Sequence, residues 1–388
     1  MIGIEKRSII FVLIIRNYEN NTHSVLCCLI IKVFNVQKNF SAQEIGEYEM
    51  YNYYDLIMGS DPSSFLSIFN NLWKNEIKSQ NLPYAHSFQI TNGNRLRPIL
   101  LAWGYYANCS SENNTYIAEY AVSIELLHKS SILLDDLIDD DVARHEKETF
   151  HVQFSESEAL LYALYILNRS ITLIHQKDAL HNQLYTSSFL EIIDNMVKGG
   201  IKEISSKDNI LNLADVKEII DLETISLIKN SFILGHQLSS ETPSDNMDDI
   251  ISIGRSCGYC FQVLNDMEPF SAPTINQKYK GKINYDFSKS RKNIIISFLY
   301  GACTPQERKK IKINSNLTYI KNLIEKYDVL PILLCELESE INSIMQCITR
   351  LQTNNLIFYT DFKKFLINMF QICYQKCNLP FKNELLYN

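Results

Sequence analysis

Apolar residues recur at intervals of three and four along almost the whole chain after residue 62. This spacing places apolar side chains along one face of an α-helix. The pattern runs through segments 96–107, 116–138, 156–175, 184–199, 216–238, 248–266 and 291–302. The alternating pattern that favours strands does not persist after residue 40. The sequence therefore predicts a single all-α domain over residues 58–388.

The composition supports a large helical core and narrows the range of partners. The chain has 388 residues, is 46% hydrophobic, and contains only 12 glycines and 9 prolines, which is little turn chemistry for an all-β fold. A net charge of -7 argues against nucleic acid as the main partner. Ten cysteines without a regular framework favour a reducing compartment, so we expect a cytoplasmic protein. Cys257 and Cys260 are interpreted as small buried thiols of a helix.

Residues 1–57 form an N-terminal extension to which the sequence assigns no role. Its apolar runs, 9–15 and 25–31, are each too short to cross a bilayer. A strand pair, an anchor and a poorly structured extension all fit this pattern. No segment of the chain has the 18 or more uninterrupted apolar residues of a spanning helix, so none is predicted.

The segment LLHKSSILLDDLIDDDVARH at 126–145 concentrates acidic residues in an apolar setting. Its aspartates are Asp135, Asp136, Asp139, Asp140 and Asp141. Side chains four residues apart share a helix face, so Asp135 and Asp139 point together. Carboxylates this close repel one another unless a cation or water lies between them. Paired oxygen ligands suit Mg²⁺, and the alternative is an acidic helix end bathed in water.

Other polar segments offer partners for phosphate groups and for a second metal ion. Arg95 and Arg97 lie in NGNRLRP, at a turn that enters a helix, and arginine forks bind phosphate oxygens in pairs. Asn265 and Asp266 end an apolar helix with oxygen ligands. A basic loop follows, with Lys280, Lys282, Lys289, Arg291 and Lys292. Each feature alone also fits a solvated surface.

Together these segments resemble the trans-isoprenyl diphosphate synthase (polyprenyl synthetase) family. NGNRLRP is similar to the family's GGKRLRP, and the aspartate segment is similar to its first aspartate-rich region, DDxxD. FQVLNDMEP at 261–269 is similar to the second region, FQxxDDxxD, and Lys282 with Asp286 and Arg291 to the lysine-rich loop. The resemblance covers roughly residues 62–300. It implies the isoprenoid synthase fold, a helical bundle around a deep central cavity, usually as a homodimer.

The resemblance implies a metal role for both aspartate-rich segments. Asp135 and Asp139 would bind Mg²⁺, with Asp136 supporting them. Asn265 and Asp266 would form a second, weaker set of metal ligands. The chemistry explains these residue types, because breaking an allylic C–O bond leaves a carbocation and a diphosphate whose new charge metal ions and cations stabilise.

The resemblance also implies the residues that bind the two substrates. Arg97 and His128 would hold isopentenyl diphosphate, and Arg144 would hold the allylic diphosphate. Lys282 would reach the allylic diphosphate from the far side, and Gln262 would sit near the reacting allyl group. The remaining substrate contacts are assigned to Thr224, Phe261, Ser130 and Ser131. The two serines would form the floor of a pocket deep enough for roughly fifteen to twenty carbons or more, since helix rise places them below Asp135.

Several positions depart from the family's pattern. Asn94 replaces the lysine of GGKR, His145 replaces an arginine after the aspartates, and Glu223 replaces the lysine of a Lys-Thr pair. Asn265 and Pro269 weaken the second aspartate-rich region. We therefore expect an intact first metal site, an eroded second one, and a carboxylate at Glu223 that weakens substrate binding.

Condensation of an allylic diphosphate with isopentenyl diphosphate is the first hypothesis, because Arg97, His128 and Lys282 persist. The departures leave other functions open. A terpene synthase would ionise farnesyl or geranylgeranyl diphosphate without condensation. A peptide prenyltransferase and a non-catalytic subunit are the remaining alternatives. The sequence does not determine the natural substrate or the product.

Overall fold

The computed structural model describes residues 63–107, 113–144, 147–181, 183–206, 210–239, 246–271, 292–313, 317–351, 356–377 and 379–381. The chain divides into two units, Met1–Tyr53 and Tyr54–Asn388, and all of these residues belong to the second. Apart from one two-stranded hairpin, the regular elements within these ranges are helical. The predicted all-α class is therefore confirmed, whereas the expectations for residues 1–57 lie outside the described residues.

The first half of the unit contains the elements that carry the arginine and aspartate segments. In chain order they are α4 (Ser63–Ser79), η2 (Pro83–His86), α5 (Phe88–Thr91), α6 (Leu96–Tyr106), α7 (Asn114–Asp139), β1 (Ala143–Arg144), β2 (Lys147–Glu148), α8 (Phe150–Gln153), α9 (Glu156–His181) and α10 (Thr186–Ser205). The second half continues with α11 (Leu213–Ile220), η3 (Asp221–Ile225), α12 (Ser226–Leu238), α13 (Met247–Ser271), α15 (Ile294–Ala302), α16 (Pro305–Ile313), α17 (Leu317–Lys326), α18 (Val329–Leu351) and α19 (Leu356–Lys376).

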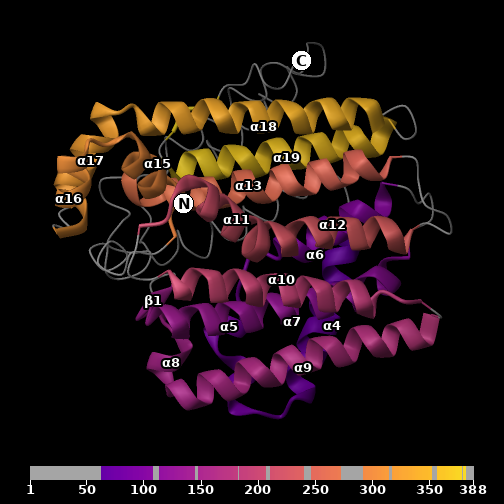
Figure 1. Cartoon of the computed structure of the whole chain (residues 1–388). Helices are drawn as coiled ribbons and strands as arrows, with labels where there is room; N and C mark the ends of the chain where they lie inside the picture. The colour runs from indigo at the N-terminus through magenta and orange to yellow at the C-terminus, as the bar shows by residue number, and fades with distance from the viewer. Residues whose placement is uncertain are drawn as a thin grey trace, which may run out of the picture. The chain divides into compact units, whose positions relative to one another are not determined.

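The long helices lie side by side in a bundle (Figure 1). Helix α18 packs on α13, α13 on α12, α12 on α6, α6 on α7, and α7 on α9. The α6–α12 contact is especially close, because a Cβ atom added at Gly104 would lie 2.0 Å from the Phe232 carbonyl oxygen. A Cβ atom added at Gly235 would lie 1.9 Å from the Leu101 carbonyl oxygen. Only glycine permits this approach of the two backbones.

Helix α7 is buried on almost all of its faces between Ile117 and Leu133, as expected for an apolar helix at the centre of a bundle. It ends at a left-handed residue, Asp140, with φ 54°. The Asp141 amide then donates to the Asp136 carbonyl oxygen at 2.9 Å, a bond that closes the helix end. The fold thus fixes both the buried middle of α7 and its acidic end.

Two further expectations concern the described helices. Cys257 and Cys260 are buried free thiols of α13, as predicted, and burial raises the pKa of both. None of the described helices is both long enough and apolar enough to span a bilayer.

Candidate active site

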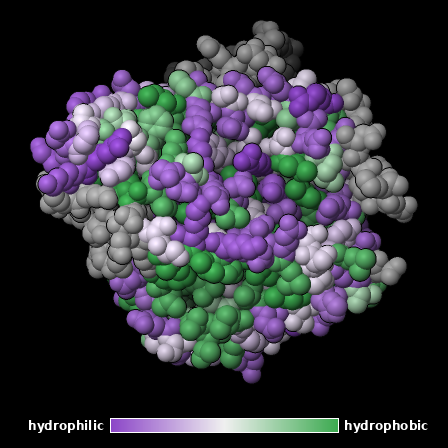
Figure 2. All heavy atoms as spheres, viewed as in Figure 1, coloured by the Kyte–Doolittle hydropathy of each residue, from purple (hydrophilic) through white to green (hydrophobic). Residues whose placement is uncertain are grey.

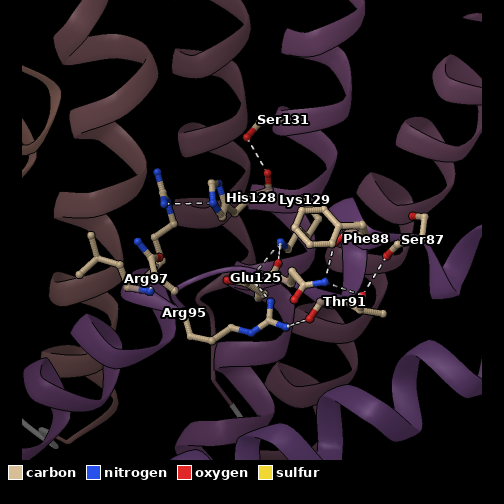
Figure 3. Close-up of polar contacts among 12 residues, drawn as sticks. Ser87, Phe88, Thr91, Arg95, Arg97, Glu125, His128, Lys129 and Ser131 are labelled. Carbon is tan, nitrogen blue, oxygen red and sulfur yellow. Dashed lines mark hydrogen bonds and ion pairs between the residues drawn. The ribbon is translucent and has the colours of Figure 1, made fainter. Parts of the chain in front are cut away.

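The structure brings Arg97 and His128 together, as the resemblance implied. Arg97 lies in the first turn of α6 with 8% of its surface exposed, and its Nη1 lies 3.1 Å from Nε2 of His128 on α7 (Figure 3). Burial, reinforced by the charge of Arg97, lowers the pKa of His128 well below its usual range. The imidazole is therefore neutral at pH 7 and accepts a hydrogen bond from the guanidinium.

Arg97 stays charged although it is buried, since burial lowers its pKa only to about 10. Its Nε has no hydrogen-bond partner among the described residues. A buried guanidinium N–H without a partner is costly unless a ligand accepts from it. Arg97 therefore has the properties of a residue that binds an anion.

Arg95 holds the turn before α6 in place. It adopts a left-handed backbone with φ 54°, and its guanidinium pairs with the buried Glu125 carboxylate on α7. The guanidinium also lies 4.9 Å from the centre of the Trp73 ring. Asn94, at the position of the family's lysine, accepts a hydrogen bond from the Leu96 amide at 3.1 Å. Both side chains thus serve the geometry of the turn.

Sequence reasoning missed Lys129, which is 2% exposed on α7. Its ammonium group donates to the Asn92 carbonyl oxygen and lies 3.8 Å from Glu125 (Figure 3). Burial, with the charges of Arg95 and Arg97, lowers the pKa of Lys129 to about 8. The available signal was a lysine inside an apolar helix, four residues after a glutamate and next to His128.

The buried groups around this turn carry more positive than negative charge. Among the described residues they are the cations Arg95, Arg97 and Lys129 and the single carboxylate Glu125. Uncompensated buried charge is strongly unfavourable unless a counter-ion is present. The cluster, which we call the cationic pocket, therefore favours an anionic ligand of high charge, such as a diphosphate.

The acidic end of α7 forms a second polar centre. Asp136 is 1% exposed and accepts from Arg144, with Nη2 at 2.6 Å and Nε at 2.8 Å from its Oδ1. Asp135 is 57% exposed and lies 3.3 Å from the same guanidinium. The β1–β2 hairpin, in which Arg144 pairs with Lys147, positions this arginine. Burial raises the pKa of Asp136, and Arg144 opposes the shift.

This end of α7 has the donor set of a divalent-metal site. Asp135 is exposed and Asp139 is half-buried, so both can reach a ligand from solvent. Asp136 Oδ2 is buried and has no hydrogen-bond partner among the described residues. Within the same part of the chain, no group of three or more acidic, histidine or cysteine side chains is placed to hold a metal ion. Mg²⁺ is usually bound by one or two carboxylates together with water and substrate phosphates, and not by a closed cage of protein ligands. A pair of carboxylates at this helix end is therefore consistent with Mg²⁺.

The second aspartate-rich segment forms an internal hydrogen-bond chain. Thr224 Oγ1 donates to Gln262 Oε1 at 3.0 Å, and Gln262 Nε2 donates to Asp266 Oδ1 at 2.8 Å. The other Asp266 oxygen accepts from the Ile294 amide, in the first turn of α15, at 2.9 Å. Both oxygens of the 8%-exposed Asp266 are therefore engaged. Asp266 therefore stabilises the start of α15 and the orientation of Gln262, and this arrangement does not favour the expected metal role.

The other residues predicted for this site lie on α13 and in the basic loop that follows it. Phe261 and Asn265 are half-buried on α13. The side chains of Glu268 and Pro269 lie outside the described part of the structure, and so do Lys282, Asp286, Arg291 and His145. The assignment of Lys282 to the allylic diphosphate therefore stays a prediction.

The charge at Glu223 is neutralised within the protein. Its carboxylate pairs with the Lys292 ammonium group, which also lies 3.4 Å from Glu203 of α10. The Lys292 amide donates to Glu203 as well, at 3.2 Å. The expectation that Glu223 weakens diphosphate binding loses its basis, because an unpaired carboxylate was its premise.

The hydroxyl groups of Ser130 and Ser131 both form hydrogen bonds within the protein. The Ser130 hydroxyl is buried and donates to the Ala163 carbonyl oxygen of α9 at 2.9 Å, so Ser130 belongs to the α7–α9 contact. Ser131 is half-buried and donates to the His128 carbonyl oxygen of its own helix at 2.8 Å (Figure 3). The role of these serines as the floor of the chain pocket stays a prediction.

The described elements form an all-α fold with two polar centres along α7. Residues 80–325 match the family model described as polyprenyl synthetase, which is more than half of the chain. The chain belongs to the polyprenyl synthetase family and is a prenyltransferase of that family.

Known proteins of similar sequence or similar fold include several prenyl diphosphate synthases. The chain is 27% identical over 267 residues to geranylgeranyl diphosphate synthase of Saccharolobus solfataricus, covering 65% of this chain and 78% of that protein. Its fold is similar to that of a decaprenyl diphosphate synthase from Rhodobacter capsulatus, with a TM-score of 0.68 at 14% identity over 84% of this chain and 99% of the other. A polyprenyl synthase from Caulobacter crescentus, solved with calcium and isoprenyl diphosphate, gives a TM-score of 0.62 at 17% identity, over 85% of this chain and 95% of the other.

Proposed function

We propose that the protein condenses an allylic diphosphate with isopentenyl diphosphate in a reaction that requires Mg²⁺. The observation that carries this proposal is that α7 bears two separate polar centres. His128, in the cationic pocket, precedes Asp135 by two helical turns, or about 10 Å of helix rise. Condensation needs a site for each of two diphosphates, whereas ionisation of a single substrate needs only one.

In this proposal the acidic end of α7 takes the allylic diphosphate. Asp135 and Asp139 would hold Mg²⁺, which supplies positive charge to the diphosphate as it leaves. Asp136 holds Arg144 by a hydrogen bond from Nε and an ion-pair contact with Nη2, so the guanidinium is already oriented before substrate binds. Orientation before the reaction lowers the reorganisation that the charged transition state requires.

The cationic pocket would take isopentenyl diphosphate. Arg97 offers its unpartnered Nε–H, and the neutral His128 fixes the orientation of the guanidinium. Gln262, which the resemblance assigns to the neighbourhood of the reacting allyl group, is held in one orientation by Thr224 and Asp266.

We further propose that the protein is a homodimer in which the second copy covers α9 and α10. Figure 2 shows hydrophobic residues gathered over these two helices. The exposed large hydrophobic residues on α9 and α10 are Leu160, Leu161, Leu164, Tyr165, Leu180, Leu190, Val197, Ile201 and Ile204. On α10 the spacing from Leu190 through Val197 and Ile201 to Ile204 matches the seam of paired helices. A two-fold interface uses one self-complementary patch, which this continuous face provides.

Light scattering on the purified chain tests the dimer. Val197→Glu and Ile201→Glu together should convert a dimer to a monomer, while Lys198→Glu, on the same helix, should not. A monomeric wild-type protein would contradict the proposal.

The described cysteines are all free thiols, which supports a reducing compartment such as the cytoplasm.

One assay separates condensation from its main alternative. The protein is incubated with labelled farnesyl diphosphate and Mg²⁺, with and without isopentenyl diphosphate, and the products are extracted. Longer prenyl diphosphates that form only with isopentenyl diphosphate support the proposal. A hydrocarbon or alcohol formed without it favours a terpene synthase. This alternative remains because Asp266, a predicted ligand of the second metal site, instead accepts a hydrogen bond from the first turn of α15. Chelation of Mg²⁺ should stop either reaction.

A further inference from the structure

Lys129 is a buried cation that the proposed chemistry has not yet used. Its side chain is 3% exposed, and among the described residues its ammonium group has one hydrogen-bond acceptor, the Asn92 carbonyl oxygen. The Glu125 carboxylate lies 3.8 Å away, beyond hydrogen-bond distance, and its Oε1 already accepts from Arg95. An ammonium group has three donors, so this charge is only weakly satisfied by the protein.

The surroundings of Lys129 are arranged to leave it room. Gly93 has φ 139°, and a Cβ atom there would approach the ammonium nitrogen to 3.0 Å. A larger residue at this position would therefore crowd the lysine as well as strain the backbone. Lys129 also follows His128 directly in α7, so it lies on the same helical turn as the partner of Arg97.

We propose that Lys129 is a second cationic ligand, beside Arg97, of the diphosphate in the cationic pocket. Asn92 and Glu125 hold it in the absence of substrate, and its ammonium group turns to the diphosphate when substrate binds. The inference rests on the proposed function of this pocket, and it adds a residue that determines how strongly the pocket binds isopentenyl diphosphate.

The charges that face Lys129 make this role dependent on pH. Glu125 on α7 stabilises its ammonium form, while Arg95, Arg97 and Arg144 oppose it. His128 adds no charge, because its pKa is far below neutrality. With a pKa of about 8, Lys129 is mostly charged at pH 7 and mostly neutral at pH 9. A ligand that needs this charge must therefore bind more weakly as the pH rises, whereas an arginine keeps its charge throughout.

Calorimetric titration with isopentenyl diphosphate tests the inference. Lys129→Met should weaken binding by about tenfold to a hundredfold, the effect of one charge-assisted hydrogen bond. Wild-type affinity should fall by up to about tenfold from pH 7 to pH 9, and Lys129→Arg should remove most of this fall. Lys177→Met is the matched control, because Lys177 is half-buried and pairs with Glu119 near the start of α7. Circular dichroism verifies that each variant is folded.

The outcomes separate this inference from the proposed function. If Arg97→Gln weakens binding while a folded Lys129→Met does not, Lys129 only pins the turn and the inference is overturned. A wild-type pH dependence that Lys129→Arg leaves unchanged would overturn it as well. If the wild-type protein binds no isopentenyl diphosphate at pH 7, the proposed function itself fails.

Discussion

The cationic pocket and the Thr224–Gln262–Asp266 chain are both polar, yet they are satisfied in opposite ways. In the pocket, Arg97 keeps an unpartnered N–H among the described residues, and the positive charges outnumber Glu125. In the chain, each described hydrogen bond ends on another protein group, and the last acceptor caps α15. Buried polar groups are normally paired, so an unpaired set indicates a ligand and a closed set indicates structure.

A related contrast separates the two aspartate-rich segments, of which the sequence already marks the second as eroded. Both aspartate-rich segments end apolar helices with acidic residues. Asp135 is exposed beside a guanidinium, whereas Asp266 is buried and bound on both oxygens. We call the first the open segment, because its Asp135 side chain is mostly exposed, and the second the closed segment, because both oxygens of Asp266 are bound within the protein.

The largest expected effect concerns the open segment. Asp135→Asn should lower turnover by about a thousandfold or more, because a metal ion supplies several kcal/mol of charge stabilisation. The same substitution should leave the urea-unfolding free energy nearly unchanged, because the Asp135 side chain is 57% exposed. Asp140→Asn, at an exposed position of the same helix end, is the matched control. Near-normal turnover of Asp135→Asn at limiting Mg²⁺ would contradict the metal assignment.

The second prediction concerns the closed segment. Asp266→Ala removes the acceptor of Gln262 and of the Ile294 amide, so the unfolding free energy should fall by about 2–4 kcal/mol. The Mg²⁺ concentration for half-maximal activity should not change. Asn293→Ala, which removes the side-chain cap of α15 at Ile295 and Ile296 and a 3.4 Å hydrogen bond to the Asp266 carbonyl oxygen, should cost about 1 kcal/mol. A raised Mg²⁺ requirement in Asp266→Ala with normal stability would show that the second segment does bind metal.

A third prediction concerns the ion pair beside the closed segment. In a double-mutant cycle with Glu223→Gln and Lys292→Met, we expect a coupling energy of about 1 kcal/mol in the unfolding free energy. Both side chains are less than one-fifth exposed, at 18% and 13%. The Michaelis constants should stay unchanged in both single variants. A change in these constants with no coupling energy would restore Glu223 to the substrate site.

The periodicity of the sequence predicted the helices well, but not where the chain departs from regular geometry. The apolar pattern over 216–238 predicts one helix, whereas the structure interrupts it with a π-helical turn at Asp221–Ile225. Such turns insert an extra residue and are frequent at functional sites. Here the turn carries both Glu223, which pairs with Lys292, and Thr224, which contacts Gln262. Both partners are distant in sequence, so the pattern within one segment could not reveal the turn.

The sequence was also limited in predicting which residues contact one another across helices. The family resemblance predicted that Arg97 and His128 act on the same substrate, and the two side chains do lie together. It could not reveal that Ser130 faces α9 or that Lys129 meets Asn92, since both depend on which elements pack against α7. The sequence thus predicted which residues are chemically able to act, and packing decided which of them are already engaged.

The last prediction follows from the neutral state of His128. Its pKa is depressed in the folded protein, so the unfolded chain binds more protons below about pH 6.5, and stability is lost as the pH falls below that value. Between pH 7.5 and pH 5.5 this should lower the unfolding free energy by up to about 1.4 kcal/mol. Lys129 does not interfere in this window, because its pKa of about 8 keeps it charged. In His128→Gln the loss should shrink by that amount, whereas His175→Gln, at an exposed position on α9, should behave as wild type. An identical pH dependence in His128→Gln and wild type would mean that the imidazole takes up its proton in the folded protein, and that Arg97 is not held by a neutral partner.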